Sequence, residues 1–466
     1  MKVAIFGAGP CGLTAALELA NNGVTPIVIE KETSVGGLCK TIRKNGYQFD
    51  LGGHRFISKD SDLIENIRTL MADELLTRTR KSVIRFCDRE FDYPVNIHNV
   101  IKQSSPWMTL KFILGYSASL AGLPISCARE NSFERWVDIN FGKPLNSFFF
   151  KPYTEKLWGI PASDLSDDWA AQRISLLNAG MVLRKALGLT KATPRSYASK
   201  YLYPKKGIGS IFERMTAEII SSGGQVLTGV YPLKFETKGN RIYRVLVENS
   251  EGNKNYIEAD RYLSTIPLDS LVRLLGYDKS PALPFRSLRF LNIQLNRENL
   301  SPNTWMYIPE TDPIMTRIQE PKHRSPFSAP NGKTSVILEI PCGKGDAVWS
   351  MSDEELLHIT VKDLKTLGFY IENEISGYFS TWAEHAYPCY KIGYRKTVEE
   401  MQHIVNGFEN MTTLGRQGVF RYIFMDTAMV MGRTWAKTIL GRNREDQIID
   451  EIDSKPVLLE TQSLAC

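Results

Sequence analysis

Residues 2–20 read KVAIFGAGPCGLTAALELA. Residues 2–6 are a short apolar run that predicts a β-strand, and residues 13–20 have the apolar spacing of an amphipathic helix. Between them Gly7, Gly9 and Gly12 form the pattern G-x-G-x-x-G. In such a unit the first glycine permits the tight turn, the second lets the backbone approach a pyrophosphate, and the third lets helix and strand pack closely. The stretch therefore predicts an α/β, Rossmann-like fold that binds a dinucleotide.

A second parallel strand is expected at residues 26–30, which read PIVIE, after the helix ends at Gly23. Its last residue, Glu30, follows the first glycines by about twenty residues, where an acidic side chain bonds a ribose hydroxyl in such folds. A lone glycine pattern also occurs in ordinary turns. Here the strand, the helix and the acid occur together, but they do not distinguish FAD from NAD.

Composition limits the class of protein. At 466 residues, the chain is long enough for two or three domains. Its net charge of +6 comes from dispersed side chains, which speaks against nucleic-acid binding and is compatible with an anionic substrate. Seven scattered cysteines, without C-x-x-C or a signal peptide, predict reduced thiols and a cytoplasmic location. The histidines are isolated, so no metal site is expected.

Three further patterns predict local structure. Residues 59–79 predict one helix, and frequent alternating runs from 288 to about 379 predict an antiparallel sheet. Residues 107–123 are the most apolar stretch, but Lys111 interrupts them and they are too short to cross hydrocarbon. We expect a buried helix there, and a membrane-surface patch is the alternative.

Nothing in the sequence resembles a nucleophile elbow, a paired-carboxylate motif or a metal triad. Tyrosine, tryptophan and arginine recur instead, at residues 93, 153–173, 307–317, 387 and 416–422. Guanidinium groups form paired bonds to phosphate, and tyrosine hydroxyls add neutral donors for a diphosphate. Any one such residue is more often a half-buried surface or core residue. The residues alone therefore point no further than an anionic substrate.

Two later stretches resemble a known superfamily. Residues 31–38 read KETSVGGL and residues 49–54 read FDLGGH. Both resemble the extended signature of the FAD-binding superfamily that includes amine oxidases, protoporphyrinogen oxidases and UDP-galactopyranose mutases. The resemblance implies FAD as the cofactor, with the second loop passing the isoalloxazine. The cofactor-binding residues expected on this basis are Gly7, Gly9, Gly12, Glu30, Lys31, Gly36, Gly37, Leu38, Gly53, His54 and Asp426.

Other motifs resemble the UDP-galactopyranose mutase family, especially its eukaryotic branch. Residues 93–96 (YPVN) resemble Y-P-x-Q, 152–158 (PYTEKLW) resemble P-Y-N-x-K-x-W, 169–173 (WAAQR) resemble W-x-x-E-R, and 415–422 (GRQGVFRY) resemble G-R-x-G-x-x-x-Y. The substrate-binding residues so implied are Tyr93, Asn96, Thr154, Trp158, Arg173, Tyr307, Arg317, Tyr387, Arg416 and Tyr422. The catalytic residues so implied are Arg317, Arg416 and His54.

The resemblance implies a FAD-dependent nucleotide-sugar mutase, which interconverts pyranose and furanose rings without net redox change. In that family N5 of reduced flavin attacks the anomeric carbon, the diphosphate leaves, and the sugar recloses with another ring size; protein groups orient the sugar and stabilise the departing charge. NAD(P)H could act as reductant, and a homo-oligomer is compatible with the sequence. No transmembrane segment is expected.

Some residues depart from the family pattern. Asn96 and Thr154 replace glutamine and asparagine, and Thr427 follows Asp426 where the eukaryotic branch has histidine. The sugar and the nucleotide base therefore stay open. The alternative function is a FAD-dependent oxidase or dehydrogenase of an amine, a sugar or another small metabolite on the same scaffold, because fold does not fix function.

The patterns and the resemblance together predict three interleaved domains. The FAD-binding domain takes residues 1–88, 200–268 and 405–466, the last including a loosely held tail. A helical substrate-flap domain is expected at 89–199, and an antiparallel-sheet substrate domain at 269–404.

Overall fold

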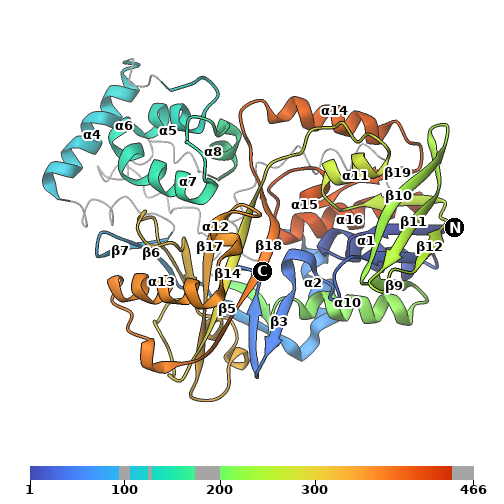
Figure 1. Cartoon of the computed structure of the whole chain (residues 1–466), viewed down its shortest axis with the longest axis horizontal. Helices are drawn as coiled ribbons and strands as arrows, with labels where there is room; N and C mark the ends of the chain where they lie inside the picture. Colours follow the sequence, from blue (N-terminus) through green and yellow to red (C-terminus); the bar gives the residue numbers. More distant parts are fainter. Residues whose placement is uncertain (94–104, 124–127, 174–199, 443–466) are drawn as a thin grey trace.

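The computed structural model describes residues 1–93, 105–123, 128–173 and 200–442 (Figure 1). Three parts of the predicted helical domain, residues 94–104, 124–127 and 174–199, lie outside these residues. So do residues 443–466, which include the predicted tail. In the view of Figure 1 the N-terminal sheet and its helices lie at the right, a large sheet lies at the centre, and a group of helices lies at the upper left. The division into three domains stays a prediction.

The N-terminal sheet is parallel and has the order β19-β13-β1-β2-β9. Its strands are β1 (Lys2–Phe6), β2 (Thr25–Glu30), β9 (Gln225–Thr228), β13 (Arg261–Ser264) and β19 (Met411–Thr413). Side chains of β1 alternate between two buried faces, as a period of two requires. Val3 and Ile5 belong to the core beside α1 (Pro10–Ala20), α10 (Ser210–Ser221) and α16 (Met425–Ile439). Ala4 and Phe6 face the opposite core.

That opposite core joins the parallel sheet to a three-stranded antiparallel sheet with the order β10-β11-β12. Its strands are β10 (Val230–Lys238), β11 (Arg241–Asn249) and β12 (Lys254–Ile257). Phe235 of β10 meets Phe6 edge-on, with ring centroids 5.1 Å apart. Helices α11 (Leu268–Leu274) and α14 (Tyr394–Asn406) contribute to the same core. The parallel sheet is therefore covered on both faces, which explains why β1 reads as a continuous apolar run.

The large sheet has the order β18-β14-β17-β16-β15-β6-β7. Its strands are β6 (Ser82–Phe86), β7 (Arg89–Asp92), β14 (Phe285–Leu295), β15 (Trp305–Tyr307), β16 (Arg317–Gln319), β17 (Thr334–Cys342) and β18 (Ile375–Pro388). Neighbours are antiparallel except β6 and β15, which are parallel. Helix α13 (Asp353–Thr366) packs Leu356 and Leu364 into the same core as Ile293 and Leu338.

Smaller elements connect these layers. They are β3 (Thr41–Lys44), β4 (Tyr47–Asp50), α2 (Ser61–Met71), β5 (Leu75–Thr79), β8 (Lys200–Pro204), α12 (Ala347–Ser350), α15 (Gly415–Gly418) and 3-10 turns at Gly37–Cys39, Ala72–Glu74, Pro321–His323, Pro326–Ser328 and Glu372–Glu374. The upper-left group contains α4 (Pro106–Leu120), α5 (Phe133–Phe141), α6 (Lys143–Leu145), a π-helical turn (Asn146–Phe150), α7 (Lys151–Trp158) and α8 (Asp167–Arg173).

Two secondary-structure predictions are wrong in part. The helix predicted over 59–79 ends at Met71, because Ala72 adopts a positive φ of 44° and residues 75–79 pair with β8 instead. The β-rich stretch predicted from 288 to 379 is interrupted by α13. Its start carries a capping box in which Ser352 and Glu355 exchange hydrogen bonds, a signal present in the sequence.

The prediction of a buried helix over 107–123 is also wrong. Helix α4 forms, but none of its residues is buried. It packs through Gly115, where an added Cβ would lie 2.4 Å from Cδ of Pro144 in α6. Trp107 and Leu114 are 66% and 60% exposed. Among the described residues, the model contains no helix whose length and hydropathy would let it cross a bilayer.

Candidate active site

A cavity of about 1460 Å³ lies where the parallel sheet, the large sheet and the helical group meet. It is larger than the roughly 300–1,000 Å³ of a typical small-molecule site. Its walls include the glycine turn after β1, the loop at residues 51–55, strands β16 and β18, and the segment from α15 to the start of α16. The cavity therefore has room for a cofactor and a second ligand.

The glycine turn has the geometry that a pyrophosphate needs. Gly7 has a φ of 103°, which favours glycine, and its N–H donates to the Ile29 carbonyl at 2.8 Å. An added Cβ at Gly12 would lie 2.1 Å from the Gly7 carbonyl oxygen, so helix and strand pack as closely as the sequence predicts. At Gly9 the space a Cβ would take is open. Gly9 also caps α1 without a side-chain bond, which leaves the first N–H groups of the helix for an anion.

The second glycine pair closes over this turn. The Gly36 N–H donates to the Ala8 carbonyl at 2.8 Å, and a Cβ on Gly37 would lie 3.3 Å from the Gly9 Cα. Glu30 accepts hydrogen bonds from the backbone N–H groups of Ala8 and Glu32, at 2.8 and 3.0 Å. Its buried carboxylate thus ties the end of β2 to the glycine turn. Six of the expected cofactor-binding residues in this region line the cavity: Gly7, Gly9, Glu30, Lys31, Gly37 and Leu38. Gly12 and Gly36 do not line it and lie behind the lining residues.

His54 lies in the loop expected beside the flavin. Burial lowers its pKa to about 3, helped by the guanidinium groups of Arg416, Arg324 and Arg317. Its Nδ1 is buried without a hydrogen-bond partner. The neighbouring Gly53 leaves space for Arg317, since a Cβ there would lie 2.8 Å from Nη1 of that arginine. His54 is therefore a neutral imidazole among cations and has no imidazolium proton to give near neutral pH. Asp426, at the start of α16, also lines the cavity and is buried.

Arg317 is held by a buried carboxylate that the sequence analysis did not single out. Its Nη2 donates to Oε1 of Glu339 at 2.7 Å and to the Tyr387 hydroxyl at 3.4 Å. The Tyr387 hydroxyl donates to the same Glu339 oxygen at 3.1 Å, and Gln319 donates to the other at 3.2 Å. Burial opposes the charged form of Arg317, but Glu339 and nearby tyrosines outweigh burial and raise its pKa. Arg317 is therefore a fixed cation.

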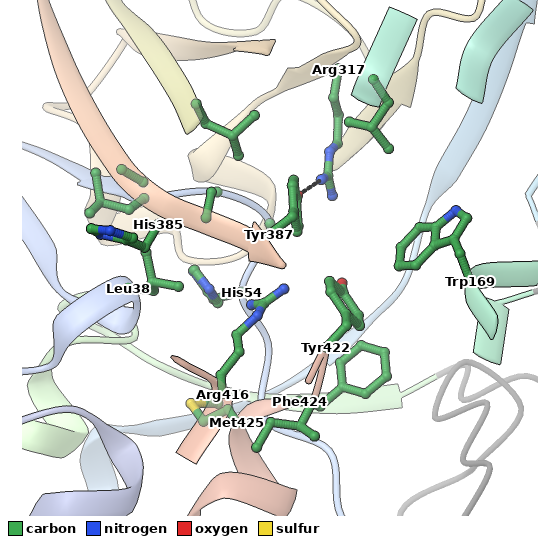
Figure 2. Close-up of a pocket in the computed structure, with 18 of the residues that line it drawn as sticks. Leu38, His54, Trp169, Arg317, His385, Tyr387, Arg416, Tyr422, Phe424 and Met425 are labelled. Carbon is green, nitrogen blue, oxygen red and sulfur yellow. Dashed lines mark hydrogen bonds between the residues drawn. The ribbon is translucent and has the colours of Figure 1, made fainter. Parts of the chain in front are cut away.

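Arg416 is a second cation, with a different environment. Its guanidinium carbon lies 4.2 Å from the ring centroid of Tyr422 and 5.3 Å from that of Tyr387. Its Nε and Nη2 are buried and have no hydrogen-bond partner. In Figure 2 Tyr387 lies between Arg317, which bonds its hydroxyl, and the pair Arg416 and Tyr422. A buried guanidinium with unused donors is costly unless a ligand supplies acceptors, so this site suits an anion.

The remaining predicted residues separate into three groups. Tyr93 and Tyr307 line the cavity with ring centroids 4.4 Å apart, and Thr154 lines it from α7. Trp158 is buried outside the lining and packs edge-on against Trp169, which does line the cavity. Asn96 lies outside the described residues, as does the side chain of Arg173, the last residue of α8.

Two residues that hold the site were missed. Glu339 is the one charged residue in the strand TSVILEIPC, and a lone carboxylate in an apolar strand was an available signal. Lys156 of α7 donates to the carbonyl oxygens of Ile308, Glu310 and Met315, at 3.1, 2.6 and 2.7 Å. Burial lowers the pKa of Lys156 to about 7. Its partners lie between β15 and β16, so it fixes the hairpin that carries Arg317.

A Rossmann-like sheet, the doubled glycine turn and a large cavity at the sheet's edge define a dinucleotide-binding class of protein. The model of the flavin containing amine oxidoreductases matches residues 10–420, and the chain belongs to this family. The chain is therefore a flavoenzyme.

Known relatives differ in activity. Coproporphyrinogen III oxidase of Staphylococcus aureus (strain NCTC 8325 / PS 47) is 21% identical over 94% of this chain and 99% of its own. The 15-cis-phytoene desaturase of Synechococcus elongatus is 26% identical over 61% of each chain. A 4,4′-diapophytoene desaturase of Staphylococcus aureus (strain bovine RF122 / ET3-1) is 44% identical, but over 52 residues, 10% of that protein.

Solved structures confirm the fold. Reduced UDP-galactopyranose mutase superposes with a TM-score of 0.82 at 21% identity and covers 100% of both chains. Putrescine oxidase bound to putrescine gives a TM-score of 0.61 at 17% identity, covering 95% of this chain and 100% of that one. At these identities the likeness speaks for the fold alone.

Proposed function

We propose that the enzyme is a nucleotide-sugar mutase that interconverts pyranose and furanose ring forms without net redox change. The observation that carries the proposal is the buried guanidinium of Arg416, whose Nε and Nη2 lack partners and which lines the same cavity as Arg317. Two arginines and two tyrosines around one space suit the diphosphate of a nucleotide sugar.

In this proposal the protein groups stabilise charge on the leaving diphosphate. Arg416 offers unused donors to its oxygens, and Arg317 adds a cation fixed by Glu339. Tyr387 stays protonated, because burial and the nearby Glu339 raise its pKa well above the usual value. Its one O–H, which donates to Glu339 here, would donate to the diphosphate after turning away from Glu339. Bound FAD, in its reduced form, would supply the nucleophile for exchange at the anomeric carbon. NAD(P)H is the proposed reductant.

Neutral His54 is consistent with chemistry that draws little on general acid catalysis. Its pKa of about 3 leaves it without an imidazolium proton for general acid catalysis near neutral pH. Its place beside Gly53, at the loop expected to pass the flavin, suits packing against the cofactor instead. His54 would therefore position the cofactor and limit the polarity around it.

The test uses FAD-loaded protein and several UDP-sugars under reducing and under oxidising conditions, with products separated by ring form. Isomer exchange with reduced flavin and no change in oxidation state is expected. A net two-electron change in the product, or full activity with oxidised flavin only, would contradict the mutase proposal.

Two variants and a control sharpen this test. Arg317→Ala and Arg416→Ala should abolish turnover while flavin absorbance stays with the protein. Arg395→Ala is the matched control, because Arg395 is 67% exposed and pairs with Asp168 at the surface. Its loss should leave turnover unchanged.

A second candidate is a FAD-dependent oxidase or dehydrogenase, favoured by the outer wall of the same cavity. That wall is aromatic and consists of Phe112, Phe141, Phe148, Phe149 and Phe150. It suits an apolar substrate better than a sugar. Oxidation of a substrate without a diphosphate, coupled to peroxide formation or to an added electron acceptor, would favour this candidate.

A further inference from the structure

Helix α4 presents an apolar outer surface. Trp107, Leu110 and Leu114 lie on one side of the helix, as their spacing of three and four residues requires, and Leu110 is 44% exposed. Ile113 and Leu120 extend this surface and are 53% and 67% exposed. A contiguous exposed apolar surface of this kind marks an interaction site for a membrane or for another protein.

The charge of the helix narrows the choice of partner. Between residues 105 and 123 the chain has no acidic residue and one basic residue, Lys111, whose Nζ lies 5.5 Å from the ring centroid of Trp107. The neighbouring α6 begins at exposed Lys143. Tryptophan is enriched where helices meet the headgroup region of a membrane, and a lysine close to the bilayer surface is attracted by anionic headgroups.

The apolar surface also continues into the cavity. Phe112 and Tyr116 line the cavity from α4, and Ile113 and Leu120 both line it and reach the outside. On the opposite side of the helix, Gly115 holds α4 against α6. One apolar strip therefore leads from the outer face of the helix to the aromatic wall of the cavity.

We propose that the outer face of α4 docks on an anionic lipid bilayer and places the adjoining lip of the cavity against it. The helix lies in the plane of the headgroups: with 15 residues at 1.5 Å each it is about 22 Å long, too short to span about 30 Å of hydrocarbon. A second copy of the chain is the poorer occupant, because a two-fold contact through this face would bring Lys111 close to its own copy, with no acidic residue on the helix to pair with it. The docking is independent of the function proposed above.

The test uses FAD-loaded protein and flotation with vesicles of phosphatidylcholine alone or mixed with phosphatidylglycerol. Binding to the mixed vesicles is expected, weakening as salt rises. The double variant Leu110→Glu/Leu114→Glu should lower the partition coefficient by about tenfold or more, because two apolar side chains are replaced by charges that the lipid repels. Lys111→Ala should weaken binding to mixed vesicles selectively.

Ile220→Glu is the matched control. Ile220 is 55% exposed on α10, which lies at the other end of the molecule from α4 in Figure 1. This variant should bind vesicles like the wild type. Flavin absorbance and Tm check that each variant is folded. The proposal is overturned if the wild type does not float, if the double variant floats equally well, or if light scattering shows a dimer that the double variant converts to monomer.

Discussion

Glu339→Gln should lower stability and raise affinity for anions at the same time. In the wild type Glu339 is 1% exposed, neutralises Arg317 across 2.7 Å and accepts from Tyr387 and Gln319. Glutamine keeps the shape but removes the negative charge. Arg317 then becomes a buried cation without a counter-charge, and breaking a buried pair in this way costs roughly 3–5 kcal/mol.

The gain in anion affinity follows from the same lost charge. A carboxylate about 7 Å from a bound diphosphate repels each of its charges by ~2.4 kcal/mol at an effective dielectric of about 20. Solvent reduces this, so removing it should strengthen binding by ~1–2 kcal/mol, or about five- to thirtyfold. Isothermal titration with UDP measures the affinity, and thermal unfolding of FAD-loaded protein measures the loss of stability as a Tm lower by several degrees.

The control is Glu320→Gln. Glu320 is similarly buried and accepts from the backbone of Leu300 and Ser301 and from Thr334, but it bonds neither Arg317 nor Tyr387. Its substitution should lower the Tm without changing UDP affinity. The reasoning about Glu339 is refuted if its glutamine variant binds UDP more weakly than the wild type, or if its Tm is unchanged.

Three further predictions concern other parts of the site. Gly12→Ala should prevent folding of the glycine turn, because the new Cβ would lie 2.1 Å from the Gly7 carbonyl oxygen. Gly9→Ala has open space for its Cβ and should fold but lose FAD. The ratio of flavin to protein and the Tm distinguish the two outcomes. The pKa of His54 is near 3 in the folded protein and about 6.5 in the unfolded chain. Below pH 6.5 the unfolded chain therefore binds one proton more than the folded protein at this residue. Stability should therefore fall from pH 6.5 to 5, and Tm measurements should show a smaller fall for His54→Asn. Lys156→Met removes three hydrogen bonds and should lower the Tm, whereas Lys151→Met, at a half-exposed pair, should change it little.

The sequence predicted the parts of the fold that local chemistry determines. Gly7 and Gly36 adopt positive φ values of 103° and 101°, which residues with a side chain disfavour. Glycine at these two positions therefore determines the conformation of the turn. The apolar runs of β1 and β2 likewise determine their burial. These features need no knowledge of distant residues.

Other features depend on contacts made far along the chain. Residues 75–79 form a strand because β8, more than a hundred residues later, pairs with them. The sequence analysis favoured burial of α4 because its composition is that of a core helix, and named a surface patch as the alternative. The helix is exposed because α5 and α6 cover only part of it. Glu339 acquires its importance from Arg317 and Tyr387, which reach it from neighbouring strands. The structure brings together Arg317, Tyr387, Arg416 and Tyr422, but their roles stay proposals.

The order β19-β13-β1-β2-β9 has a consequence for how the chain folds. Its central strand β1 is made first and pairs with β2, which follows closely in the chain, but the other strands of the sheet lie at residues 225–228, 261–264 and 411–413. Helix α16 packs on α1 only after residue 425. Contacts of such long sequence separation form slowly. Until nearly the whole chain has left the ribosome, the glycine turn lacks its final support. FAD should therefore bind only when the chain is nearly complete. Fragments that end before β19 should expose an unpaired, apolar sheet edge and aggregate.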